Sequence, residues 1–190
     1  MNVQDSEINK EVLRKNYYRT ALPKSLGPSA PIKKFEKYRK KHNIEISSVL
    51  DYGAGKQRDK EFCMKKYGEY VPHDNSPQFS INQPKKVLNR NYDLVIFNYI
   101  LNIIIPEDRI QIIDVIMEYL SNGALILLAV RTKQEKNNIK SEWKRYKDGW
   151  VTTRLTFQHF FSKAEIIKIF GEETERIIDL KRGTFILKSK

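Results

Sequence analysis

The chain has 190 residues and a formal net charge of +12 at pH 7. Its length allows one substantial hydrophobic core, and no Pro-, Gly- or Ser-rich linker divides it, so we expect residues 1–190 to form a single domain. The sequence has no run of about 20 apolar residues, and its N-terminus is polar, which argues against a membrane span and a secretion signal. The lone cysteine cannot form an internal disulfide, so we expect a cytoplasmic protein. The cysteine and the three histidines do not form a cluster with metal-ligand spacing, so we expect no metal site.

The positive charge is concentrated in two segments. Residues 1–45 contain 11 Lys or Arg and 5 acids, and residues 131–154 contain 8 and 3, whereas the rest of the chain is close to neutral. The first segment is predicted to be a basic helical N-terminal extension, because apolar residues recur at helical spacing from Ile32 to Tyr38. Ser29 is a suitable N-cap for this helix, and Asn43 is a suitable residue to end it.

The most informative motif lies at residues 49–55, where an apolar strand runs into the sequence Asp-Tyr-Gly-Ala-Gly. Glycines in such a turn let the backbone pass close to a ligand, because no Cβ intrudes and a positive φ is permitted. A dinucleotide fingerprint would have a third glycine where Arg58 stands, and a P-loop would have Ser or Thr after Lys56, where this chain has Gln57. The motif therefore predicts a nucleotide-like ligand of neither of these two classes.

A second acid, Asp74, lies about 20 residues beyond the glycines, after a short apolar stretch at residues 70–72. In a Rossmann-like sheet, a carboxylate at this spacing accepts hydrogen bonds from ribose hydroxyls. Residues 73–77 also have the composition of an ordinary polar turn, and this alternative stays open.

The middle of the chain has the pattern of a strand, a helix and a second strand. Residues 94–97 are a continuous apolar run, typical of a parallel strand covered on both faces, and Asn98 and Tyr99 stand where that strand should end. A helix is expected over residues 106–122, followed by a buried strand at residues 124–130. This order predicts an α/β fold, with a mostly parallel central sheet and helices on both faces.

The C-terminal part has the pattern of a helix and a hairpin. Ser162 and Glu165 form a capping box that opens a short helix through Phe170. Two apolar runs, residues 177–180 and 184–187, are separated by a Lys-Arg-Gly turn, which is typical of a hairpin. We expect these strands to complete the sheet.

Three stretches resemble sequence blocks of class I S-adenosylmethionine (SAM)-dependent methyltransferases, namely residues 49–55, 98–104 and 129–131. Two further stretches are similar to the methyltransferases encoded near bacterial DNA phosphorothioation systems, namely residues 19–22 followed by 29–32, and residues 153–165. The resemblance implies a Rossmann-like class I methyltransferase fold with an antiparallel last strand, SAM as the cofactor, and a loop before the first helix that folds over it. We expect the cofactor to contact Asp51, Gly53, Ala54, Gly55, Asp74, Asn75 and Asn98.

The basic segment at residues 131–154 leaves the predicted strand that ends at Val130, on the edge of the sheet where the cofactor is expected. We therefore interpret it as an insertion at the active-site edge. Trp143, Tyr146 and Trp150 alternate there with cations, a pattern that suits the phosphates and unstacked bases of DNA or RNA. The alternative is a solvated loop whose aromatic side chains pack inward. The residues expected to bind the acceptor are Arg19, Lys140, Trp143, Lys144, Arg145 and Gln158.

The expected catalytic residues are Asn98 and Tyr99, at the end of a strand, and His159 as a base. A lone histidine beside two phenylalanines is more often a structural hydrogen-bonding residue, and this alternative stays open for His159. Cytosine C5 methylation needs a cysteine nucleophile, and Cys63 falls on the predicted helix after the glycines instead. The sequence thus favours a SAM-dependent methyltransferase acting on a nucleic acid. A methyltransferase for a small molecule or a protein, and a binding protein with this fold and no activity, remain alternatives.

Overall fold

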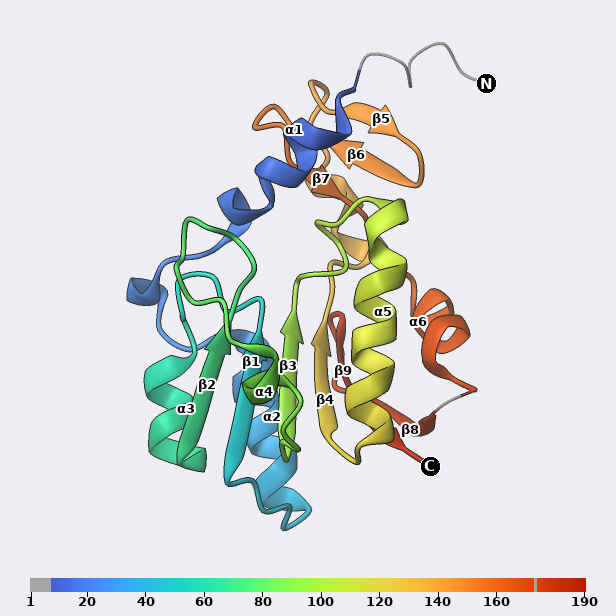
Figure 1. Ribbon diagram of the computed structural model, residues 1–190. Coiled ribbons are helices and arrows are strands. Elements are labelled where there is room, and N and C mark those ends of the chain that lie inside the picture. The colour runs from blue at the N-terminus through green and yellow to red at the C-terminus, as the bar shows by residue number, and fades with distance from the viewer. Residues whose placement is uncertain (1–7, 173) are drawn as a thin grey trace.

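The computed structural model describes residues 8–172 and 174–190 and has a six-stranded sheet at its centre (Figure 1). The strands are β1 (Ser48–Tyr52), β2 (Glu69–His73), β3 (Leu94–Asn98), β4 (Leu125–Ala129), β8 (Thr174–Asp179) and β9 (Thr184–Ser189), in the spatial order β2-β1-β3-β4-β9-β8. Strands β1 to β4 run parallel, β9 is antiparallel to β4, and β8 pairs with β9. The predicted parallel sheet with an antiparallel last strand is confirmed.

Helices cover both faces of this sheet (Figure 1). Because successive side chains of a strand point to opposite faces, β3 contributes to two separate cores. Leu94 and Ile96 pack in the cluster that includes α2 and α3, whereas Val95 and Phe97 pack in the cluster that includes α5 and α6. The four helices are α2 (Ala30–Lys41), α3 (Lys60–Tyr67), α5 (Pro106–Ser121) and α6 (Lys163–Phe170).

The helix ends follow the predicted capping signals. The Ser29 side chain accepts a hydrogen bond from the backbone N–H of Ile32 at 3.4 Å, and Asn43 has a φ of +51° just after α2 ends. Ser162 and Glu165 form both bonds of the capping box at the start of α6. The Ile32 side chain is fully buried, so α2 belongs to the body of the protein although it lies within the basic segment 1–45.

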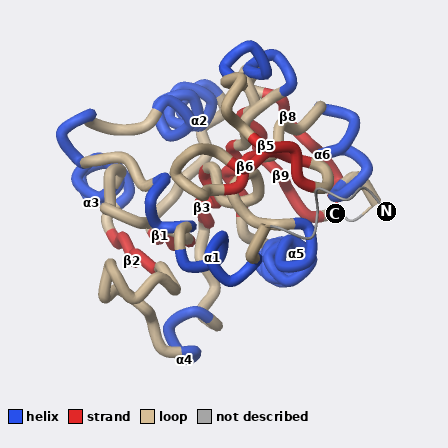
Figure 2. Tube along the Cα trace, turned by 90° about the horizontal axis from the view of Figure 1, so that it is seen from above, coloured by secondary structure: helices blue, strands red, loops and turns tan. Residues whose placement is uncertain are grey.

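A second, smaller sheet lies beyond the carboxyl ends of the central strands, next to the N-terminal helix (Figures 1 and 2). Its antiparallel strands are β5 (Lys144–Tyr146), β6 (Gly149–Val151) and β7 (Phe157–Gln158). The shorter helices are α1 (Lys10–Lys15), η2 (Tyr17–Thr20), η3 (Lys24–Leu26), α4 (Lys85–Leu88) and η4 (Lys133–Asn138). We call residues 8–23 and 140–158 the cap, because they lie over the ends of the central strands.

The cap has a hydrophobic core of its own. Leu13 of α1 is buried with Ile105, Tyr146, Val151 and Phe157, and this cluster joins the two parts of the cap to the start of α5. Tyr146 is only 1% exposed. The expectation that its ring is available to stack on a base is therefore wrong, because the tertiary contacts turn it inward.

No helix in the described part of the chain is long and apolar enough to span a bilayer. Among the same residues there is also no group of three or more His, Cys, Asp or Glu side chains arranged to hold a metal ion.

Candidate functional site

A cleft of about 1350 Å³ lies between the carboxyl ends of the central strands and the cap. Ligand pockets for one small molecule are typically about 300–1,000 Å³, so this cleft has room for two small ligands. All of the residues expected to contact a cofactor line it, namely Asp51, Gly53, Ala54, Gly55, Asp74, Asn75 and Asn98. The structure thus brings together residues from the ends of three different strands.

The first position of the turn after β1 favours glycine, because its φ is positive and a neighbouring side chain lies close to it. Gly53 has a φ of +77°, and a Cβ there would lie 2.5 Å from Cδ1 of Ile100. The backbone N–H groups of Gly53 and Ala54 both donate to the carbonyl oxygen of His73, at 2.7 and 3.0 Å. These bonds attach the turn to the end of β2 and hold its backbone against the cleft.

Asp74 organises the loop that follows β2. One carboxylate oxygen accepts a hydrogen bond from the N–H of Gly55 at 2.9 Å, and the other accepts from the N–H of Ser76 at 2.8 Å. Each oxygen of an ionised carboxylate has a second lone pair, so Asp74 retains acceptor capacity toward the cleft. Asp74, the acid predicted to act with the glycine turn, is therefore hydrogen-bonded directly to that turn.

Asp51 is 7% exposed and lies in the wall of the same cleft. The Tyr70 hydroxyl donates to Oδ2 of its carboxyl group at 2.6 Å. Burial nonetheless raises the pKa of Asp51 to about 7. A positively charged ligand beside it would favour the ionised form, because an opposite charge stabilises the carboxylate.

The end of β3 presents polar groups without partners. Both amide atoms of Asn98, Nδ2 and Oδ1, are buried and have no hydrogen-bond partner among the described residues. The next residue, Tyr99, has a φ of +63° and its N–H donates to the carbonyl of Ala129 at 2.7 Å. Such a conformation is strained for a bulky residue and is typical of functional sites. Both residues line the cleft.

Asn102 was not predicted as a site residue. It is 2% exposed, it lines the cleft, and its Oδ1 has no partner in the described structure. Its Nδ2 lies 3.4 Å from Oε1 of Gln158, which is long for a hydrogen bond. The sequence feature that could have indicated a role for Asn102 is its position as the single polar residue in the otherwise apolar stretch of residues 100–105.

The predicted acceptor-binding residues separate into two groups. Arg19, Lys140, Trp143 and Gln158 line the cleft from the cap side. Lys144 and Arg145 do not line it, because they lie on β5, where they are exposed. The Arg145 guanidinium lies 5.2 Å from the ring centroid of Trp150, so this aromatic side chain is partly covered by a cation of its own sheet.

His159 is also absent from the wall of the cleft. It is 6% exposed, with Nδ1 at 2.7 Å from the carbonyl oxygen of Asp148 and Nε2 at 3.2 Å from Oε1 of Glu165. Both ring nitrogens are thus engaged inside the protein. This geometry corresponds to the structural alternative for His159, not to a base that faces an acceptor.

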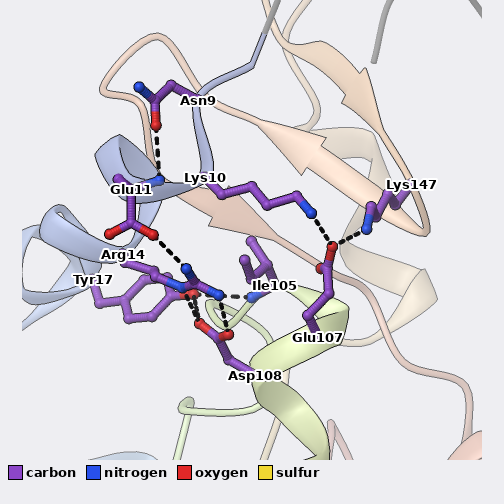
Figure 3. A network of polar contacts seen from close by, with 9 residues as sticks. All are labelled: Asn9, Lys10, Glu11, Arg14, Tyr17, Ile105, Glu107, Asp108 and Lys147. Carbon is purple, nitrogen blue, oxygen red and sulfur yellow. Dashed lines mark hydrogen bonds and ion pairs between the residues drawn. The ribbon is translucent and has the colours of Figure 1, made fainter. Parts of the chain in front are cut away.

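A polar network fastens the cap to the first turn of α5 (Figure 3). Asp108 accepts two hydrogen bonds from Arg14, and the Tyr17 hydroxyl donates to the same carboxylate at 3.1 Å. Glu107 forms ion pairs with Lys10 and Lys147. Although burial opposes it, the hydrogen bonds from these two lysines lower the pKa of Glu107 to about 2. Acids are favoured at this position because the N-terminus of a helix is electropositive.

No family model and no curated protein matches the sequence. Among solved structures, the chain is similar to a 1,6-didemethyltoxoflavin N1-methyltransferase of Burkholderia thailandensis with bound 1,6-didemethyltoxoflavin and S-adenosylhomocysteine (TM-score 0.57, 14% identity, 85% of this chain and 79% of that one). It is also similar to DesVI of Streptomyces venezuelae (0.61, 12%, 95% and 95%) and to SAM-bound CalS10, an amino pentose methyltransferase of Micromonospora echinaspora (0.58, 10%, 91% and 94%). The chain therefore has the Rossmann-like fold of class I SAM-dependent methyltransferases, as its sequence predicted.

Proposed function

We propose that this protein is a methyltransferase that uses SAM as its methyl donor. The observation that carries the proposal is the direct bond between the glycine turn and Asp74, in a cleft that also contains Asp51 and the unpaired amide of Asn98. Two of the similar structures contain SAM or S-adenosylhomocysteine, which supports the same cofactor here.

The residues of the cleft fit this cofactor chemically. Asp74 has free lone pairs for ribose hydroxyls, and the glycine turn that is hydrogen-bonded to it lines the same cleft. Asp51 has a pKa of about 7, so it becomes an anion readily when a cation lies nearby. When bound, SAM supplies an electrophilic methyl group on a positively charged sulfur.

The chain's own contribution to transfer is positioning and exclusion of water. Asn98 and Tyr99 stand at the end of β3, where an acceptor would meet the cofactor, and the cap covers this region. Among the described residues that line the cleft there is no histidine and no cysteine. Carboxylates do line it, among them Asp51 with its raised pKa, and the enclosed site suits an acceptor that is oriented beside the cofactor.

For the acceptor, we propose a nucleic acid of which one unpaired nucleotide enters the cleft. Lys140, Trp143 and Arg19 line the cap side of the cleft, and Lys144 and Arg145 continue the positive charge along β5 outside it. A backbone lying on β5 would bring one nucleotide to Trp143.

A free small molecule is the second candidate. The cap closes over the cleft, and the Burkholderia and Micromonospora neighbours are a 1,6-didemethyltoxoflavin N1-methyltransferase and an amino pentose methyltransferase. In that case the charge on β5 would have no part in binding the acceptor.

Calorimetry with SAM and S-adenosylhomocysteine tests the cofactor. Because a charge-assisted hydrogen bond contributes about 1.5–3 kcal/mol, Asp74→Ala should weaken binding roughly ten- to a hundredfold. Asp93→Ala is the matched control, since Asp93 also accepts backbone N–H bonds, from Ser47 and Ser48, but does not line the cleft. No binding to the wild-type protein, or equal losses in the two variants, would refute the proposal.

Binding of single-stranded DNA and RNA across a salt series separates the two acceptors. Lys144→Ala with Arg145→Ala should flatten the slope of log K against log[salt] by about 0.7 for each phosphate that these cations neutralise in the wild type. Lys65→Ala with Lys66→Ala, exposed cations on α3, should leave it unchanged. If wild-type protein binds no strand at low salt, the small-molecule candidate replaces the nucleic acid.

A further inference from the structure

Three uncharged amide side chains gather on one part of the cleft. Asn98 ends β3, Asn102 follows in the next turn, and Gln158 ends β7 in the cap, and all three line the cleft. Asn102 and Gln158 are 2% and 6% exposed. The sheet and the cap therefore each contribute amides to the same enclosed space.

Most of the hydrogen-bonding capacity of these amides is unused. Both polar atoms of Asn98 and Oδ1 of Asn102 are buried without partners in the described structure. The one contact in the group, from Asn102 Nδ2 to Gln158 Oε1, is 3.4 Å long. Buried polar groups are almost always paired in folded proteins. Three buried, unpaired atoms on residues of one cleft point to a ligand that pairs with them.

The unused atoms specify what the ligand must present. Two are acceptors, Oδ1 of Asn98 and Oδ1 of Asn102, and one is a donor, Nδ2 of Asn98. Nε2 of Gln158 is a further donor on a residue of the same cleft wall. A primary amide pairs best with an edge on which a donor and an acceptor stand side by side. The rings of Tyr99 and Trp143 line the same cleft and offer flat surfaces for a planar group.

We propose that Asn98, Asn102 and Gln158 together recognise the donor–acceptor edge of a planar nitrogen heterocycle, which is the methyl acceptor. This inference rests on the proposed function, since it identifies what occupies the part of the cleft beside SAM. Lactams and amidines such as those of nucleobases have this edge. The heterocycle is either a base within a single strand or a free nucleoside-like compound.

Calorimetry on the protein saturated with S-adenosylhomocysteine tests the proposal, because the cofactor then prevents nucleosides from entering its own site. The probes are the four ribonucleosides, their single-stranded decamers, and nucleosides methylated on the pairing edge. At least one nucleoside should bind, and its edge-methylated form should bind at least tenfold more weakly. A decamer that binds far more tightly than its nucleoside identifies a strand as the source, whereas equal affinities identify a free compound.

Variants connect this binding to the amides. Asn102→Leu and Gln158→Met, which keep the shape but remove polar atoms, should each weaken the heterocycle tenfold or more and leave the affinity for S-adenosylhomocysteine unchanged. Asn91→Leu, an exposed asparagine outside the cleft, is the matched control and should change neither. Asn98→Leu should keep or raise Tm, because it removes two unpaired buried atoms, whereas a structural role predicts a lower Tm.

The two levels of the proposal fail in different ways. If S-adenosylhomocysteine does not bind, the cofactor assignment is wrong. If it binds but no nucleoside or decamer does, or if methylated probes and the amide variants bind as well as their parents, the recognition of a heterocyclic edge is wrong. A drop in Tm for Asn98→Leu would assign that amide to the fold and remove it from the recognition site.

Discussion

The guanidinium of Arg14 forms two hydrogen bonds to the carboxylate of Asp108, at 2.9 and 2.7 Å, across 94 residues of sequence. Arg14 belongs to α1 in the cap, and Asp108 belongs to the first turn of α5, which packs on the central sheet. Asp108 and Tyr17 of this same network also line the cleft. The Arg14–Asp108 pair that holds the cap over the cleft is therefore also part of the wall of the cleft.

Removal of the Arg14 guanidinium should loosen the cap. In Arg14→Met the apolar stem remains but the two bonds are absent, so limited proteolysis should cleave the segment around residues 8–23 several-fold faster than in the wild type. Affinity for S-adenosylhomocysteine should fall by a smaller factor. Arg90→Met is the control, since Arg90 forms an equivalent pair with Glu69 at 2.8 and 2.7 Å away from the cleft, and it should change neither measurement. Equal cleavage in the two variants would contradict this role of Arg14.

Gly53→Ala should abolish cofactor binding and destabilise the protein. The added Cβ would lie 2.5 Å from Ile100 and would sit on a residue with a φ of +77°. Backbone strain of this kind costs about 1–3 kcal/mol, and the clash adds to it. Gly123 has a φ of +83°, but a Cβ there would have nothing within 4 Å, so Gly123→Ala measures the cost of backbone strain without a steric clash. Urea unfolding should show the larger loss for Gly53→Ala, and only that variant should lose SAM.

The contribution of Asp51 to the stability of the ligand-free protein should fall as the pH rises from about 4 to about 7. The pKa of Asp51 is raised from its ordinary 3.8 to about 7 by burial, so the folded state holds a proton that the unfolded state releases. The stabilisation from protonated Asp51 is fully present below the pKa of this group in the unfolded state. It is lost as the pH rises through its pKa in the folded state. Asp51→Asn should remove this slope, an effect on the order of a few kcal/mol, as measured by urea unfolding at pH 5 and pH 8.

The same group predicts how cofactor binding depends on pH. As Asp51 ionises near pH 7, its charge attracts the positive groups of the cofactor, so the dissociation constant of SAM should decrease with rising pH. S-adenosylhomocysteine has the same ammonium group but no sulfonium charge, so a smaller change for it would indicate that Asp51 lies beside the sulfonium. A SAM affinity that is flat from pH 5.5 to 8.5, or that varies equally in Asp51→Asn, would show that this carboxyl does not face the cofactor.

His159→Gln should affect stability more than transfer. Both ring nitrogens bond within the protein, so their loss should cost about 1–3 kcal/mol of unfolding free energy. A general base typically contributes about 10²–10⁴-fold to rate, whereas here the rate for the folded fraction should fall less than tenfold. Thermal unfolding and single-turnover transfer distinguish the two roles, and a hundredfold loss of rate at unchanged Tm would restore His159 as a base.

The segments predicted correctly from the sequence are those with a regular pattern of apolar residues or a local capping or turn signal. The apolar run that ends at Asn98 forms a buried strand, and the Ser162 capping box starts a helix, because both depend on residues adjacent in the sequence. The glycines after β1 form a turn because they readily adopt a positive φ. In contrast, β5 to β7 are two or three residues long and rich in polar groups, so no period of two could develop. They form because Leu13 and Ile105, distant in sequence, give them a common core.

The sequence by itself therefore determined the α/β pattern of strands and helices and the place of the glycine turn and Asp74, because apolar runs, capping residues and glycines act locally. Only the tertiary structure decided which side chains meet in the cleft. It directed Lys140 and Trp143 into the cleft and left Lys144 outside, and it buried the unpaired amide of Asn102 beside Gln158. Those outcomes depend on how the cap packs over the sheet, and contacts between segments so far apart leave no periodic trace in the chain.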